Sequence, residues 1–164
     1  MSPIRTILHP TDLSGPSDLA FRMACALARD CGARLVVLHV AEFPANVYPE
    51  ATRHDDPALR HPALWAKVRR LRPPSPEVPV EHRLADGDAA EEVLRAARET
   101  GSDLVVMGTH GRTGLRHLLM GSVAERVVRQ APCPVLTVKA PSPAGGGAAE
   151  AGAAIPSRQE GASS

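Results

Sequence analysis

The fold is decided by the stretch LVVMGTHGRTGLRHLLMGSVAERVV, residues 104–128. It opens with four apolar residues of strand length, continues through a glycine-rich segment from Gly108 to Gly121, and ends with apolar residues at helical spacing. A buried strand, a glycine-rich loop and a helix in this order are typical of a βα unit in a parallel sheet. Residues 104–124 contain no acidic side chain but include two arginines, so the local field favours an anion such as phosphate.

The glycines suit a backbone that curls around an anion, because they permit positive φ and a close approach. A helix starting near Ser122 would present free amides, a hydroxyl and about half a positive charge to the same anion. The segment contains neither a GxxxxGK[ST] loop nor a GxGxxG turn. The residues alone leave a second interpretation open, in which the glycines form a long tight loop and Ser122 caps the helix.

Strand-like and helix-like stretches alternate on both sides of this segment. Strands are predicted at residues 4–9, 34–40, 78–84, 104–107 and 135–138, and helices at residues 17–31, 59–71, 89–100 and from 122 onward. Pro10 is expected to end the first strand, Gly32 to follow the first helix, and the proline-containing residues 41–57 to form a loop. This order implies right-handed crossovers and an α/β fold with a five-stranded parallel sheet and helices on both faces. Ligands of such sheets bind beyond the carboxyl ends of the strands, at the topological switch point.

The length of 164 residues suits one domain, which we expect to span residues 1–140. Residues 141–164 are rich in Ala, Gly, Ser and Pro and lack apolar periodicity, so a disordered tail is predicted there. The alternation of Val78, Val80, His82 and Leu84 favours a strand near a sheet edge.

The charge balance excludes several classes of partner. Nineteen basic and eighteen acidic residues give a net charge of +1, which argues against binding to nucleic acid or an anionic membrane by bulk electrostatics. No apolar run approaches the roughly 20 residues that span a bilayer, and the N-terminus resembles no signal peptide, so a cytoplasmic protein is expected. The three cysteines show no CxxC spacing, and we expect them to be small apolar residues.

Four separated segments resemble the universal stress protein family, over about residues 3–139. The spacing Gly108-x2-Gly111-x9-Gly121-Ser122 is similar to the ATP-binding signature of that family. The family's first strand and adenosine-contacting turn, its second strand and its closing strand resemble ILHPTD at residues 7–12, VLHV at 37–40 and APCPVLTV at 131–138.

The resemblance implies an adenine nucleotide alpha-hydrolase-like fold with strand order 3-2-1-4-5. It also implies ATP or another adenine nucleotide as ligand, with Mg or Mn on the phosphates, and a homodimer formed through the last strand, Val135 to Val138. The nucleotide-binding residues that it implies are Pro10, Thr11, Asp12, Val40, Met107, Gly108, His110, Gly111, Arg112, Gly121, Ser122 and Val123. The family matches poorly between Val40 and Val78, where prolines are frequent and the second crossover helix is expected to be short or displaced.

Within this resemblance, Asp12 would contact the ribose or the adenine, and its alternative role is to bind backbone amides of the following helix. His9 and His39 are expected to pack or to bind backbone groups. Glu42, Asp86 and Asp88 would have a chemical role only beside a metal that bridges phosphates.

Two functions follow from this pattern. The first is a regulatory binding module of the stress response, in which ATP occupancy biases a dimer or a partner surface. The second is a slow ATPase or phosphotransferase that uses the same site with an acid from elsewhere, such as Asp12. The glycine-rich loop itself has no Lys and no carboxylate, which favours the first.

Overall fold

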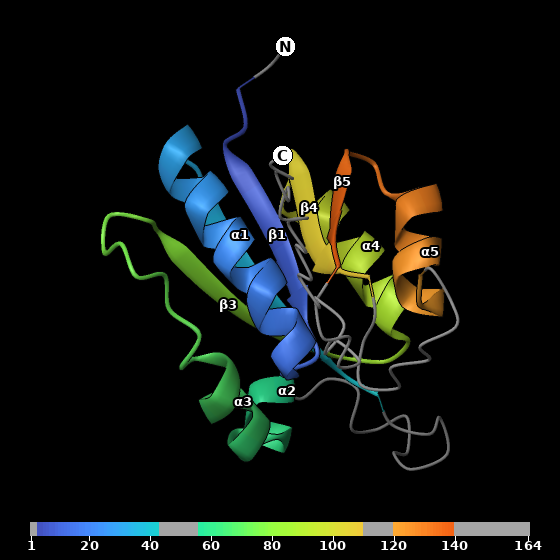
Figure 1. Cartoon of the computed structure of the whole chain (residues 1–164). Helices are drawn as coiled ribbons and strands as arrows, with labels where there is room; N and C mark the ends of the chain where they lie inside the picture. Colours follow the sequence, from blue (N-terminus) through green and yellow to red (C-terminus); the bar gives the residue numbers. More distant parts are fainter. Residues whose placement is uncertain (1–2, 43–55, 110–119, 140–164) are drawn as a thin grey trace, which may run out of the picture.

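The computed structural model describes residues 3–42, 56–109 and 120–139, and the fold is built from these parts of the chain (Figure 1). The predicted site residues His110, Gly111 and Arg112 and the predicted tail lie outside them. The elements, in chain order, are β1 (Thr6–Thr11), α1 (Gly15–Cys31), β2 (Arg34–Ala41), α2 (Pro57–Arg60), α3 (Pro62–Val68), β3 (Val80–Asp86), α4 (Ala89–Glu99), β4 (Leu104–Gly108), α5 (Ser122–Gln130) and β5 (Val135–Val138). No helix in these parts is long and apolar enough to cross a membrane.

The sheet has five parallel strands in the order β3-β2-β1-β4-β5, as predicted. The strand order reverses at β1, which lies between β2 and β4, and β3 and β5 form the two edges. One core cluster packs α1 and α3 against one face of the sheet, and another packs α4 and α5 against the opposite face. Figure 1 shows α1 crossing one face while α4 and α5 lie behind β4 and β5. Because successive strand residues point to opposite faces, β1 sends Ile7 into the first cluster and Leu8 into the second.

The first strand continues through Pro10, which the sequence predicted to end it. The carbonyl of Thr6 accepts a hydrogen bond from Asp103 N (2.9 Å), so residues 6, 8 and 10 turn their backbone polar groups toward β4. The register of β1 with β4 covers only Ile7 and Leu8. The missing N–H of Pro10 therefore lies beyond the last paired residues of that ladder, and the pairing with β2 continues through Thr11.

The single helix predicted over residues 59–71 is wrong, because two short helices stand in its place. Pro62 begins the second of them, and the residue before a proline avoids the helical region. His61 accordingly has φ −127° and ψ 60° and separates α2 from α3. The third strand also begins two residues later than predicted, since Val78 is buried just ahead of it. Gly32 follows α1 with φ +63°, as predicted for the residue that ends that helix.

Candidate functional site

A cleft of about 220 Å³ opens where three neighbouring strands end. The carboxyl ends of β1, β2 and β4 form its floor, and the first turns of α4 and α5 form its wall. Nine of the residues predicted from the sequence line it: Pro10, Thr11, Asp12, Val40, Met107, Gly108, Gly121, Ser122 and Val123. This is the switch point of the sheet, where ligands of doubly wound folds bind.

Seven further residues line the cleft; six of them were not identified from the sequence, and Glu42 was considered there only as a carboxylate beside a metal. The seven are Ser17, Leu38, Glu42, Ala89, Val93, Thr109 and Ala124. Leu38 and Glu42 lie two residues either side of Val40, so the alternation of β2 would have placed all three on one face. Ala89 and Ala124 lie in the first turns of helices, which the predicted helix starts could have indicated.

The position of Asp12 is fixed by hydrogen bonds between side chains and backbone amides of the turn that follows β1. Asp12 Oδ1 accepts from Ser14 N (3.0 Å) and from Ser14 Oγ (2.5 Å). Thr11 Oγ1 accepts from Leu13 N (3.1 Å) and from Ser17 Oγ (3.0 Å). Leu13 has φ +63°, a conformation that costs a side-chain-bearing residue about 1–2 kcal/mol. A turn held in this way is typical of functional sites, where strain orients a particular side chain.

The two oxygens of Asp12 have different environments. Oδ1 performs the backbone-binding role that the sequence left open. Oδ2 is buried and accepts no hydrogen bond from any described residue. Because a buried carboxylate oxygen without a donor is costly, Oδ2 is suited to accept a hydrogen bond from a ligand in the cleft.

Helix α5 begins at the cleft without a side-chain cap among the described residues. Its N-cap is Gly121, so the interpretation of Ser122 as the cap is wrong. The first helical hydrogen bond runs from Glu125 N to the carbonyl of Gly121 (2.9 Å). The amides of Ser122, Val123 and Ala124 precede it and have no acceptor within the helix, and all three residues line the cleft.

Of the two reasons predicted for glycine at position 121, positive φ is wrong, and the close approach of the backbone to an anion stays a prediction. Gly121 has φ −72° and ψ 157°, an extended conformation open to any residue. Its value to the site is therefore the absence of a side chain beside the cleft. Gly121 N donates to the carbonyl of Thr109 (2.7 Å), and Thr109 N donates to the carbonyl of Val138 (3.1 Å). These bonds hold both ends of the glycine-rich segment against the sheet.

His9 and His39 connect neighbouring strands, in agreement with the expectation that they bind backbone groups. His9 Nδ1 donates to the carbonyl of Val106 (2.9 Å), and His39 Nδ1 donates to the carbonyl of Thr11 (2.8 Å). Burial lowers the pKa of His9 to about 4, so this side chain is neutral at pH 7. Both rings stabilise the frame of the cleft.

Two of the three remaining acidic candidates have structural partners. Asp86 forms an ion pair with Arg60 (2.6 Å) and contacts His61 Nε2 (3.1 Å), and these contacts hold the junction between α2 and α3 against the end of β3. Asp88 Oδ1 accepts from Glu91 N (2.9 Å) and caps α4. Glu42 is the acidic candidate that lines the cleft.

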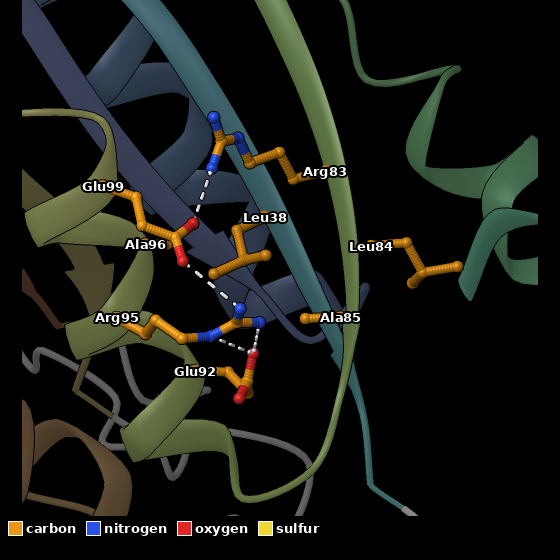
Figure 2. A pocket seen from close by; sticks show the side chains of 8 residues that line it. All are labelled: Leu38, Arg83, Leu84, Ala85, Glu92, Arg95, Ala96 and Glu99. Carbon is orange, nitrogen blue, oxygen red and sulfur yellow. Dashed lines mark hydrogen bonds and ion pairs between the residues drawn. The ribbon is translucent and has the colours of Figure 1, made fainter. Parts of the chain in front are cut away.

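A second hollow of about 200 Å³ lies between β3 and α4 (Figure 2). Its charged side chains pair with one another: Arg83 with Glu99 (3.2 Å), and Arg95 with Glu99 (3.3 Å) and with Glu92. Because each of these charged side chains is paired with an opposite charge, fewer charged groups are available to a ligand here than in the cleft at the strand ends.

The fold and the cleft define a doubly wound α/β domain with a helix N-terminus that has no side-chain cap among the described residues at its switch point. The chain belongs to the universal stress protein family, whose model matches residues 3–139. A universal stress protein of Thermus aquaticus, from the QAH/OAS sulfhydrylase 3′ region, is 38% identical over 136 residues, which cover 82% of this chain and 98% of the relative.

Solved structures of the family share the fold. A universal stress protein in complex with cAMP has a TM-score of 0.63 and 24% identity, and covers 84% of this chain and 99% of that one. A universal stress protein of Archaeoglobus fulgidus in complex with dAMP has a TM-score of 0.55 and 21% identity, with 84% and 98% covered. The predicted family and fold are therefore confirmed.

Proposed function

We propose that the cleft binds an adenine nucleotide, with ATP as the cellular ligand, and that the protein is a regulatory binding module of the stress response. The main evidence for this proposal is the set of backbone amides at the start of α5. Three amides without helical acceptors, on Ser122, Val123 and Ala124, belong to residues that line the cleft. A helix N-terminus of this kind attracts phosphate through its amides and its dipole.

The rest of the cleft suits a nucleoside. An apolar surface for the base is formed by Leu38, Val40, Val93 and Met107. Asp12 Oδ2, which has no donor among the described residues, can accept a hydrogen bond from a ribose hydroxyl. With the phosphates at α5, beside β4, the sugar lies over the end of β1 and the base extends toward β2. The family members solved with cAMP and with dAMP support an adenine nucleotide as the ligand.

A metal would enter with the nucleotide. The described residues contain no group of three or more His, Cys, Asp or Glu side chains able to hold a metal ion. At the phosphate end, residues 104–124 have no carboxylate. A Mg or Mn ion would be bound mainly by phosphate oxygens and water, and the Ser122 hydroxyl in the cleft could serve as an oxygen ligand.

We also propose a cytoplasmic homodimer that pairs through β5. This strand is a sheet edge, and its Leu136 is 37% exposed. An apolar edge strand is normally covered or paired, and two copies can pair around a two-fold axis. Sedimentation at micromolar concentration tests this: a folded monomer would contradict it, and Leu136→Lys should dissociate a dimer.

Mass spectrometry of small molecules released from freshly purified protein tests the ligand directly. We expect an adenine nucleotide at near-stoichiometric occupancy, and titration calorimetry should give ATP a higher affinity than GTP. A turnover assay separates the two functions, since a kcat in the enzyme range of about 1–10³ s⁻¹ would replace the binding module by an enzyme. Protein that releases no nucleotide and binds none in solution would contradict the proposal.

A further inference from the structure

The cleft changes from apolar to charged along one face of β2. Leu38 is 2% exposed, Val40 is half-buried, and Glu42 is exposed. All three line the cleft: Leu38 and Val40 lie two apart on one face of β2, and Glu42 is the first residue after β2 ends at Ala41. The residue that follows the strand therefore places a carboxylate just beyond the apolar floor.

The backbone just before Glu42 is held in place by the neighbouring edge strand, β3. The carbonyl of Ala41 accepts a hydrogen bond from Gly87 N (3.2 Å), and Ala41 is in register with Asp86. Asp86 in turn contacts Arg60 and His61. The Glu42 side chain itself has no ion pair or hydrogen bond with any residue in the described parts of the chain. A fixed backbone thus presents an unengaged carboxylate to the cleft.

The strand order determines which part of a nucleotide lies beside Glu42. Gly121 and Ser122 follow β4, and β2 lies beyond β1 on the other side of the switch point. A ligand with its phosphates at α5 therefore reaches β2 with the end farthest from the phosphates, which is the base. This step rests on the proposed function.

We propose that Glu42 determines base specificity by accepting a hydrogen bond from the exocyclic 6-amino group of adenine. An ionised carboxylate is an acceptor only, so the ligand atom beside it must be a donor. Adenine attached to a sugar through N9 has one donor group, the 6-amino group. The ribose hydroxyls are the nucleoside's other donors, and they lie closer to the phosphates, near Asp12. Glu42 is therefore a specificity residue for 6-aminopurine nucleotides, and it acts independently of the phosphate contacts.

A thermodynamic cycle that combines a protein variant with a ligand analogue tests this directly. Calorimetry measures the affinity of wild type, Glu42→Ala and Glu42→Gln for ATP and for purine riboside triphosphate, which has hydrogen in place of the 6-amino group. In wild type we expect ATP to bind about tenfold more tightly, the effect of one exposed charge-assisted hydrogen bond. Glu42→Ala should bind both ligands equally, and Glu42→Gln should keep about a threefold preference through its amide oxygen.

Glu77→Gln is the matched control, because Glu77 is also exposed but does not line the cleft. It should retain the full tenfold preference. An equal preference for ATP in wild type and Glu42→Ala would overturn the assignment of Glu42 and leave the nucleotide site standing. A change in affinity by the same factor for both ligands would overturn it as well, since it would report charge repulsion of the phosphates. Wild-type protein that binds neither ligand would overturn the proposed function itself.

Discussion

Helices α4 and α5 both begin at the cleft, but their first turns find partners in different ways. Asp88 caps α4 with its own carboxylate, and Arg126 of α5 pairs with Asp88 (2.9 Å) and with Glu91 (2.8 Å). The start of α5 has Gly121 as its cap and no capping side chain among the described residues. One amide in the first turn of α4, that of Glu91, therefore has a side-chain acceptor within the protein, whereas no side chain accepts from the first turn of α5 among the described residues.

The two helices that form this wall of the cleft are therefore expected to differ in role: the start of α4 contributes to folding stability, and the start of α5 contributes to ligand binding. A helix start that is satisfied by side chains contributes to folding in the absence of any ligand. An uncapped helix start lacks this stabilisation until an anion binds to its free amides. Ligand binding should therefore stabilise the protein. At a ligand concentration of 100 times Kd, the gain in unfolding free energy is about 2.7 kcal/mol.

The largest expected effect comes from blocking the uncapped start with a side chain. Gly121→Val should lower ATP affinity by more than about a hundredfold, because the added side chain occupies the space beside the exposed amides. The extended backbone at this position tolerates valine, so unfolding should stay cooperative, with a loss of about 1 kcal/mol or less. Calorimetry with ATP and denaturant unfolding measure the two quantities.

Gly15→Val is the control for that variant. Gly15 begins α1, is exposed, has no atom within 4 Å of an added Cβ, and does not line the cleft. It should bind ATP with wild-type affinity. If Gly121→Val is folded and binds ATP normally, the start of α5 is not the phosphate site.

The cleft requires that β1 and β4 stay side by side, and His9 links them through its hydrogen bond to the carbonyl of Val106. Acid should weaken this link through the protonation of His9. The buried ring has a folded pKa of about 4, below its ordinary value of 6.5. Below pH 6.5 His9 is protonated in the unfolded chain but stays neutral in the folded chain. The free energy of unfolding is therefore highest above pH 6.5 and falls as the pH drops toward 4. Between pH 7 and pH 4.5 the cost is about 2–3 kcal/mol.

Urea midpoints at the two pH values measure this loss. His9→Asn, whose amide can still donate to the carbonyl of Val106, should be less stable at pH 7 but should lose less stability on acidification. Equal losses in wild type and His9→Asn would assign the acid sensitivity to other groups.

A smaller effect is expected at Asp12, which acts on the nucleoside. Asp12→Asn can keep the Oδ1 contact with Ser14, whereas it replaces the buried acceptor Oδ2 by a donor. ATP affinity should fall by roughly tenfold or more, the value of one charge-assisted hydrogen bond. Inorganic triphosphate should bind as it does to wild type, because it lacks the sugar and the base. A matching loss for triphosphate would move Asp12 from the nucleoside to the phosphates.

The apolar runs predicted the parallel sheet because they are short, distinct and separated by clear turn signals, and the strand order was implied by the family resemblance. The sequence was less reliable where a tertiary contact decides the outcome. Pro10 stays within β1 because it lies beyond the last paired residues of the β1–β4 ladder while its pairing with β2 continues, and no local pattern reveals the extent of either ladder. The break between α2 and α3 was available locally, since Pro62 interrupts the predicted helix.

The candidate site shows the same division. Asp12 and Gly121 were identified from motifs, and the structure brings both to one cleft. The motif gave no indication that one oxygen of Asp12 is engaged and the other is not, because that depends on the fold of the turn. Glu42 was noted only as a residue beyond a strand end, and its place in the cleft depends on the register of β2.

The smallest effect should come from removing the cap of α4, and it tests the contrast between the two helices most directly. Asp88→Ala deletes the acceptor for Glu91 N and one partner of Arg126, so unfolding free energy should fall by about 1 kcal/mol. ATP affinity should stay within about twofold, because neither Asp88 nor Glu91 lines the cleft. Ser122→Ala should show the reverse pattern, with stability unchanged within about 0.5 kcal/mol, since Ser122 is not the cap, and ATP affinity lowered several-fold. Thermal unfolding and calorimetry of both variants give the comparison. A loss of ATP affinity in Asp88→Ala as large as that in Ser122→Ala would mean that both helix starts serve the ligand.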